Sequence, residues 1–279
     1  MKKILFISSL AVALVVSSCK KADFADSYTD PSKIAVSSVE KQFSGFVNSN
    51  LGYIMPGYWN YFVVQRITNN RYTQSVGWSN ATGQYIPGGG AVSDHWNAYY
   101  TFLSQYKELV KINKSLPAAD QAERRIFMIA ATIYFYDYTQ KMVDVHGDIP
   151  WSAAGMLSAN GGDYLASLPK YEKAQDIYTK MLDDLKAFST ELNSLTIPAA
   201  IQTAFNTQDF ILKGSKAHWT RYCNSLRLRM LTRVSGSTEF AARATSEIAA
   251  MATAPATFPM VSSNAENVQI NVFSLNTPV

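Results

Sequence analysis

The chain has 279 residues and a formal net charge of +4, and 47% of its residues are hydrophobic. This length is sufficient for one sizeable hydrophobic core or two small ones. Beyond the first three residues no run of basic residues is longer than two, so the chain lacks the electrostatic footprint of a nucleic-acid-binding protein.

The N-terminus has the pattern of a lipoprotein signal peptide over residues 1–18. Two lysines form a positive start, an apolar stretch covers residues 4–16, and small residues precede Cys19. We therefore predict that Cys19 is lipidated, that residues 19–35 form a tether, and that acyl chains anchor the protein in a membrane. The alternatives are an ordinary signal peptide with an incidental cysteine, or a short membrane anchor.

Cys223 is the only cysteine besides Cys19. Once Cys19 is lipidated, no internal disulfide can form, so stability must come from the burial of apolar side chains. We expect Cys223 to be an inert, buried, small apolar residue.

The region after the tether is predicted to contain two helices and a long loop. A loose helical pattern covers residues 36–66, and Met55-Pro56-Gly57 divides it. Residues 69–93 have no helical period and combine large aromatic residues with amide and guanidinium groups. We interpret this loop as a carbohydrate site, because rings stack on sugars and polar groups bind hydroxyls. The alternative is that the aromatic side chains hold the loop on the core. The candidate ligand-binding residues are Asn70, Arg71, Tyr72, Trp78, Asn80, Tyr85 and Trp96.

Two consecutive helices are predicted after this loop. Trp96 is expected to open the first, and the second is a central helix over residues 120–146. Asp120 with Glu123 three residues later resembles a capping box, and Gly147 ends the helix. Because apolar residues lie on more than one side of the central helix, we expect its neighbours to bury it. Together the two helices predict an αα-hairpin.

The second half of the chain is also predicted to be helical. A second loop covers residues 152–170, and helical spacing predicts helices over 171–193, 216–234 and 238–252. Phe210-Ile211-Leu212 is interpreted as a strand or an extended connector. The recurring helix pairs predict an all-α fold of stacked, tetratricopeptide-like hairpins with long loops on one face, although the strict repeat signature is absent.

No arrangement of residues predicts catalysis, a cofactor or a metal site. His95, His146 and His218 lie far apart in the sequence and lack metal-ligand spacing. Asp144, His146 and Asp148 could coordinate a cation, but their place at a helix end favours capping and turn roles. Four arginines could indicate an anionic ligand, but in stacked helices such residues more often bridge helices through carboxylates and carbonyls. These arginines are Arg221, Arg227, Arg229 and Arg233.

Four features taken together resemble the SusD/RagB family of surface lipoproteins, and in particular its SusD-like branch. They are the signal ending at Cys19, the motif Trp96-x-x-Tyr99, the tyrosine-rich helix leading into Gly147-Asp148-Ile149-Pro150-Trp151, and the stretch from His218 to Arg229 with its Asn-Ser-Leu-Arg-Leu-Arg run. The resemblance spans nearly the whole chain and implies a SusD-like helical domain over residues 36–279. Family members are usually much longer, so the C-terminal part of this domain is expected to be missing.

The resemblance also implies a function without enzymatic activity. The protein would bind a nutrient, either a glycan or a peptide, and deliver it to a SusC-like, TonB-dependent transporter, whose barrel it would cap as a lid. It would be lipid-anchored in the outer membrane and exposed at the cell surface. Two alternatives stay open, a glycan-processing surface enzyme and a helical-repeat adaptor that binds only proteins.

Overall fold

The computed structural model describes residues 37–55, 57–58, 61, 89–270, 273–274 and 277–278. The predicted signal peptide, Cys19 and the tether lie outside these residues, as does most of the predicted loop over residues 69–93. Apart from Ser37, the described residues belong to one compact unit that begins at Ser38.

The described part of this unit is mostly helical, which confirms the all-α prediction. Its helices are α3 (Val39–Asn48), α4 (Leu51–Ile54), α6 (Gly89–Lys114), α7 (Ala118–Glu123), α8 (Arg125–His146), α9 (Ala174–Ser194), α10 (Ala199–Gln208), α11 (Lys216–Val234) and α12 (Ala241–Thr253). Two short antiparallel pairs join β1 (Ile149–Pro150) to β2 (Tyr171–Glu172) and β3 (Phe273–Ser274) to β4 (Thr277–Pro278). Two 3₁₀ turns are also present, η2 (Leu165–Ser167) between β1 and β2 and η3 (Asn264–Glu266) after α12.

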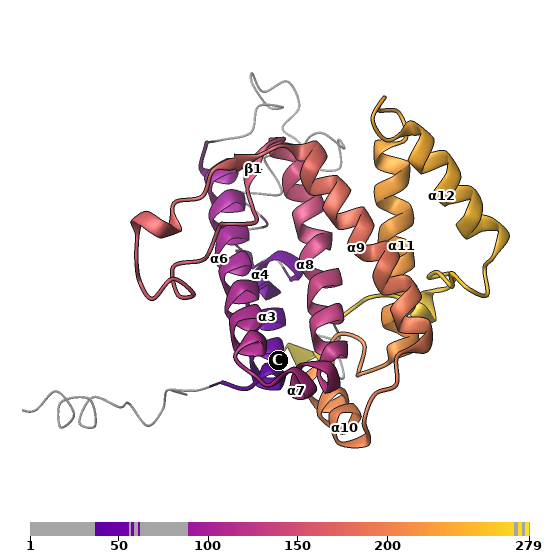
Figure 1. Ribbon diagram of the computed structural model, residues 1–279, viewed down its shortest axis with the longest axis horizontal. Coiled ribbons are helices and arrows are strands. Elements are labelled where there is room, and N and C mark those ends of the chain that lie inside the picture. Colours follow the sequence, from indigo (N-terminus) through magenta and orange to yellow (C-terminus); the bar gives the residue numbers. More distant parts are fainter. Residues whose placement is uncertain are drawn as a thin grey trace, which may run out of the picture. The chain divides into compact units, whose positions relative to one another are not determined.

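Helix α8 is buried on nearly all sides, as its sequence predicts. Phe127 and Ile129 lie on opposite sides of the helix, and both are fully buried. The helix contacts α3, α6, α9 and α11, and Figure 1 shows it between α6 and α9. Because each fully buried large apolar side chain contributes about 1.5–3 kcal/mol, this helix supplies much of the driving force for folding.

Stacked aromatic rings join α3, α6 and α8. The rings of Phe46 and Phe102 are stacked with centroids 4.5 Å apart, and those of Tyr106 and Phe135 with centroids 4.3 Å apart. The Tyr106 hydroxyl also lies 2.9 Å from the Thr132 hydroxyl, so burial of this phenol leaves no polar atom unpaired. These contacts confirm that the predicted αα-hairpin of α6 and α8 packs as a pair.

The start of the central helix differs from the prediction. Asp120 does not cap it, because a separate short helix, α7, begins after Pro117 and contains Asp120 in its first turn. The fixed φ of proline suits the start of a helix, so a helix begins after Pro117, before the start that was predicted at Asp120. Arg124, with φ −87° and ψ 11°, then separates α7 from α8. The predicted end is correct, since Gly147 caps α8 with φ 71°, a conformation that favours glycine.

Three other boundaries also differ, and one helix was not predicted. The first helix ends at Asn48, so the break comes before Met55. Helix α6 begins at Gly89, which places Trp96 about two turns inside it rather than at its start. Helix α9 begins at Ala174, because the residues before it pair with β1. Helix α10 was not predicted, because its ten residues bury only Ile201 and Phe205 and therefore show too few apolar positions to reveal a period.

The four arginines of α11 all pair with carboxylates on other elements, which confirms their predicted bridging role. Arg229 pairs with Asp137 of α8 at 2.7 Å, and Arg227 pairs with Glu247 of α12 at 2.7 Å. Arg221 pairs with Glu266 and Arg233 with Asp144. Cys223 on the same helix is fully buried, and burial raises the pKa of its thiol to about 12, so the thiol is inert at neutral pH.

The segment between α10 and α11 is a turn around a buried carboxylate, not a strand or an extended connector. Asp209 is fully buried and accepts the backbone N–H groups of Ile211, Leu212 and Gly214, each at 3.0 Å. It also accepts the indole N–H of Trp219 at 2.7 Å. Four hydrogen-bond donors offset the free-energy cost of burying this carboxylate. These bonds also hold the turn that leads into α11.

We predict that Asp209→Ala lowers the free energy of unfolding by about 3 kcal/mol or more, because it leaves several buried donors without an acceptor. The measurement is urea unfolding followed by circular dichroism. The matched control is Asp163→Ala, which removes an exposed carboxylate that accepts the backbone N–H of Ala166 at 3.1 Å. This variant should lose less than about 1 kcal/mol, because water replaces the lost acceptor. Equal losses in the two variants would contradict the assigned role of Asp209.

Candidate functional site

Trp96 is the candidate ligand-binding residue that falls within the described part of the chain. The other six candidates, Asn70, Arg71, Tyr72, Trp78, Asn80 and Tyr85, lie outside the described residues and remain predictions. Trp96 is half-buried on α6, the helix that begins at Gly89 within the predicted binding loop. Chain continuity therefore links Trp96 to that loop.

Trp96 belongs to a group of rings where the beginning of α6 meets the end of α8. Its ring centroid lies 4.9 Å from that of Tyr100 and 5.1 Å from that of His146. His95 stacks against His146 with centroids 5.6 Å apart. We call Trp96, Tyr100, His95 and His146 the Trp96 cluster. The antiparallel hairpin brings these residues together although His95 and His146 are 51 positions apart in the sequence.

The turn after α8 attaches to the same end of the hairpin. The Tyr100 hydroxyl donates to the carbonyl of Pro150 at 2.9 Å, and Pro150 pairs with Tyr171 across the short sheet. Tyr171 is 67% exposed. The surface beside the Trp96 cluster thus presents a tyrosine ring to solvent next to a fixed backbone turn, which is the combination of ring face and polar groups that a sugar site uses.

The acidic residues around this turn have structural roles, as their position favours. Asp148 accepts the backbone N–H of Ala174 at 2.9 Å and so caps the start of α9. Asp144 accepts the Tyr178 hydroxyl and pairs with Arg233 at 3.2 Å. Among the described residues there is no group of three or more metal-ligating side chains.

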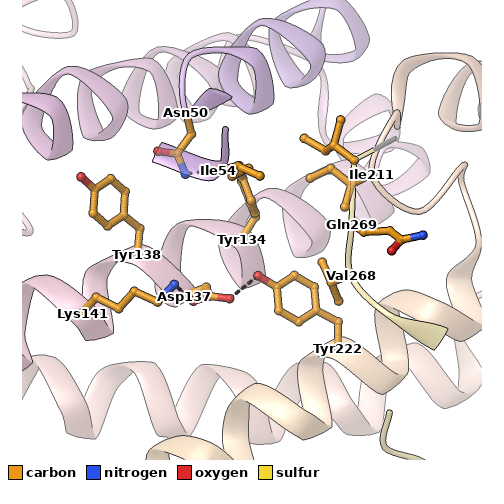
Figure 2. Close-up of a pocket in the computed structure, with 11 residues that line it drawn as sticks. Asn50, Ile54, Tyr134, Asp137, Tyr138, Lys141, Ile211, Tyr222, Val268 and Gln269 are labelled. Atoms are coloured by element: carbon orange, nitrogen blue, oxygen red, sulfur yellow. Dashed lines mark hydrogen bonds and ion pairs between the residues drawn. The ribbon is translucent and has the colours of Figure 1, made fainter. Parts of the chain in front are cut away.

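A second candidate site is a pocket of about 140 Å³ between α4, α8, α11 and the segment after η3 (Figure 2). Its wall combines three tyrosine rings with a carboxylate, an ammonium group and two amides. The lining residues are Asn50, Ile54, Tyr134, Asp137, Tyr138, Lys141, Ile211, Tyr222, Val268, Gln269 and Ile270. This pocket was not predicted from the sequence. The sequence feature that could have indicated it is the spacing of Tyr134, Asp137, Tyr138 and Lys141, which places them on one face of α8.

Asp137 is the electrostatic centre of this pocket. Its carboxylate accepts the Tyr222 hydroxyl at 2.5 Å and the Arg229 guanidinium at 2.7 Å, and it lies 3.2 Å from the Lys141 ammonium. Burial raises the pKa of Asp137, but Lys141, Arg229 and the Tyr222 hydroxyl outweigh it, so the pKa falls below its usual value. The carboxylate is therefore ionised and already neutralised by its neighbours at pH 7.

The size of this pocket limits what it can bind. Sites for drug-sized ligands usually occupy about 300–1,000 Å³, and a water molecule occupies about 30 Å³. A volume of about 140 Å³ suits a few waters or one small polar group, not an oligosaccharide. Of the two sites, the surface at the Trp96 cluster is therefore the better candidate for a large ligand.

We predict that Asp137→Asn destabilises the protein at neutral pH but not in acid. A carboxyl whose folded-state pKa is lowered contributes stability above its unfolded-state pKa, and this contribution is lost as pH falls through the folded-state pKa. At pH 7 the loss should be about 1–3 kcal/mol. Urea unfolding of both proteins between about pH 2.5 and pH 7 measures the difference.

The control for this experiment is Asp183→Asn on α9, whose side chain is 60% exposed in its pair with Arg243. Its effect at pH 7 should stay below about 1 kcal/mol. A deficit of Asp137→Asn that is the same at about pH 3 as at pH 7 would refute the proposed charge stabilisation.

Within the described residues, no helix is long and apolar enough to span a bilayer.

No curated protein sequence matches this chain. Several solved structures do, among them two neighbours in fold. A chitin-binding protein has a TM-score of 0.58 and 23% sequence identity, covering 83% of this chain and 45% of its own. The protein BT1043 has a TM-score of 0.60 and 20% identity, covering 85% of this chain and 46% of its own. This chain thus corresponds to less than half the length of either protein.

A family model described as "SusD-like, starch-binding associating with outer membrane" matches residues 40–278. The match includes the predicted binding loop, the α6–α8 hairpin and the arginine-rich helix α11. It covers most of the chain, and the observed helical architecture is that of two structural neighbours. The chain therefore belongs to the SusD-like family, whose model is described as starch-binding and associating with the outer membrane.

Proposed function

We propose that this protein binds a glycan at the outer membrane and delivers it, chemically unchanged, to a TonB-dependent transporter. The observation that carries this proposal is the match of residues 40–278 to a family described by starch binding and outer-membrane association. Lipidation of Cys19 would anchor the protein there, and the lipoprotein pattern of residues 1–19 supports that anchor.

The Trp96 cluster is our proposed place for part of the glycan site. Trp96 is half-buried, and its ring packs on Tyr100 and His146, so it can offer a fixed ring without a large loss of side-chain entropy. Tyr171 is exposed and pairs with Pro150, whose carbonyl accepts the Tyr100 hydroxyl of the cluster. The predicted loop residues, among them Trp78 and Tyr85, would supply the remaining contacts.

The loop over residues 152–170 is our proposed docking surface for the transporter. Large apolar side chains on this loop are unusually exposed, with Leu165 at 80% and Leu168 at 54%. The loop itself is held in place. Lys107 and Lys111 of α6 donate to Ser152 and Ser158, both at 2.7 Å. A held loop that exposes leucines is what a protein-binding surface requires.

We predict that the full chain binds soluble starch and that Trp96→Ala weakens this binding at least tenfold, about 1.4 kcal/mol. Affinity electrophoresis in amylopectin gels and calorimetry with maltooligosaccharides measure the binding. The matched control is Tyr164→Ala, which removes an exposed aromatic residue of the 152–170 loop and should leave affinity unchanged.

Circular dichroism of each variant shows whether it is folded. Chitin oligosaccharides, chosen because of the chitin-binding neighbour, test a second glycan class. Absence of binding to starch and to chitin oligosaccharides would refute a site for either glycan. Release of new reducing ends during the assay would instead favour the glycan-processing enzyme.

We also predict that Leu165→Glu reduces the amount of TonB-dependent transporter that copurifies with the protein from solubilised outer membranes. A buried carboxylate without a partner opposes docking at an apolar surface. The control is Ala187→Glu, which adds the same charge on the exposed side of α9. Mass spectrometry quantifies the transporter in each preparation. Equal recovery with both variants would exclude Leu165 from the interface, and recovery of no transporter with the unmodified chain would refute the partnership.

A further inference from the structure

The structure brings together two of the three histidines of the chain. The Nδ1 atom of His95 on α6 lies 3.4 Å from the Nε2 atom of His146 at the end of α8, although 51 positions separate the two residues in the sequence. The third histidine, His218, lies on the first turn of α11. The antiparallel α6–α8 hairpin therefore creates a pair of facing imidazole nitrogens that no local motif encodes.

The distance between these nitrogens matches the edge of a metal coordination tetrahedron. Zinc–imidazole bonds are about 2.0–2.1 Å long, which places two tetrahedral nitrogen ligands about 3.3–3.4 Å apart. The observed separation is 3.4 Å. The two rings are inclined to each other by 21°. Their facing nitrogens lie within hydrogen-bond distance, so an ion that binds both would replace a direct contact between the two imidazoles.

Neighbouring rings hold both imidazoles in these orientations. The His146 ring packs against the edge of Trp96 at 5.1 Å, and the His95 ring packs against Tyr138 at 5.7 Å. Both histidines are half-buried, which leaves one side of the pair open to solvent. This packing restricts the rotation of both imidazole rings. Two protein ligands would leave further coordination positions for water.

Metal binding requires neutral imidazoles and is opposed by neighbouring positive charge. Lys141 is the nearby positive charge that would oppose a cation, and its ammonium pairs with Asp137 at 3.2 Å, which reduces that opposition.

We propose that His95 and His146 together bind a divalent transition-metal ion of the zinc, copper or nickel class and thereby join α6 to α8. Imidazole ligands select these ions over calcium and magnesium, which prefer oxygen. The ion would tie the beginning of α6 to the end of α8 beside Trp96. This proposal does not rest on glycan binding, because it depends only on the two rings and the helices that carry them.

The test is calorimetric titration of the full chain, purified without a polyhistidine tag, with Zn²⁺ at pH 7. We expect one ion per chain and at least tenfold weaker binding in both His95→Gln and His146→Gln. The matched control is His218→Gln, which removes the remaining histidine of the chain and should bind as tightly as the unmodified protein. Calcium should produce no binding at the same concentrations.

Two further measurements keep the proposal testable if a variant folds poorly. Saturating Zn²⁺ should raise the melting temperature of the unmodified protein and of His218→Gln, but not of His95→Gln. Cu²⁺ should quench part of the tryptophan fluorescence, and Trp96→Phe should remove that part while Cu²⁺ still binds, because Trp96 contacts His146. The proposal is wrong if the unmodified chain binds no Zn²⁺, or if His218→Gln weakens binding as much as the other two variants.

Discussion

The burial of α8 is the constraint that governs the packing of the other helices. A helix that is buried on nearly all sides leaves little face for solvent, so α3, α6, α9 and α11 pack around it. Its few polar side chains then need partners from those same neighbours. Tyr136 donates to Asp184 of α9, and Asp137 pairs with Arg229 of α11. The hydrophobic requirement thus determines the packing, and the polar pairs determine the orientation of each neighbouring helix.

The same constraint places both candidate sites. Because α6 packs antiparallel to α8, the end of α8 lies beside the beginning of α6, where the Trp96 cluster forms. The other site arises where the polar face of α8, with Asp137 and Lys141, meets α4 and α11. The Trp96 cluster is a group of rings at the surface, and the site at Asp137 is a small, charge-balanced pocket. Their sizes and exposures suit different ligands, a polymer at the edge and small polar groups in the pocket.

Buried polar groups stabilise the fold in two ways, locally within a turn and between distant helices. Asp209 organises a local turn with backbone donors, whereas the Arg227–Glu247 pair joins α11 to α12 across the fold. Arg227 also lies over the ring of Phe258, with 5.6 Å between its guanidinium carbon and the ring centroid, which ties the segment after α12 to α11. Such groups are costly to bury and are tolerated only when paired, so they specify which helices meet.

Local sequence is enough to specify the helical class, the central helix, its end at Gly147 and the length of α11, because these depend on apolar period and on glycine and proline. It also indicates the family through the turn at Gly147–Trp151 and the arginine-rich helix. Which distant residues meet depends on tertiary packing. His95 with His146, and Tyr222 with Asp137, are brought together by the packing of helices. For the same reason, helix α10 and the turn at Asp209 could not be predicted from the local sequence. Their stability comes from contacts with other elements, and a local pattern does not record such contacts.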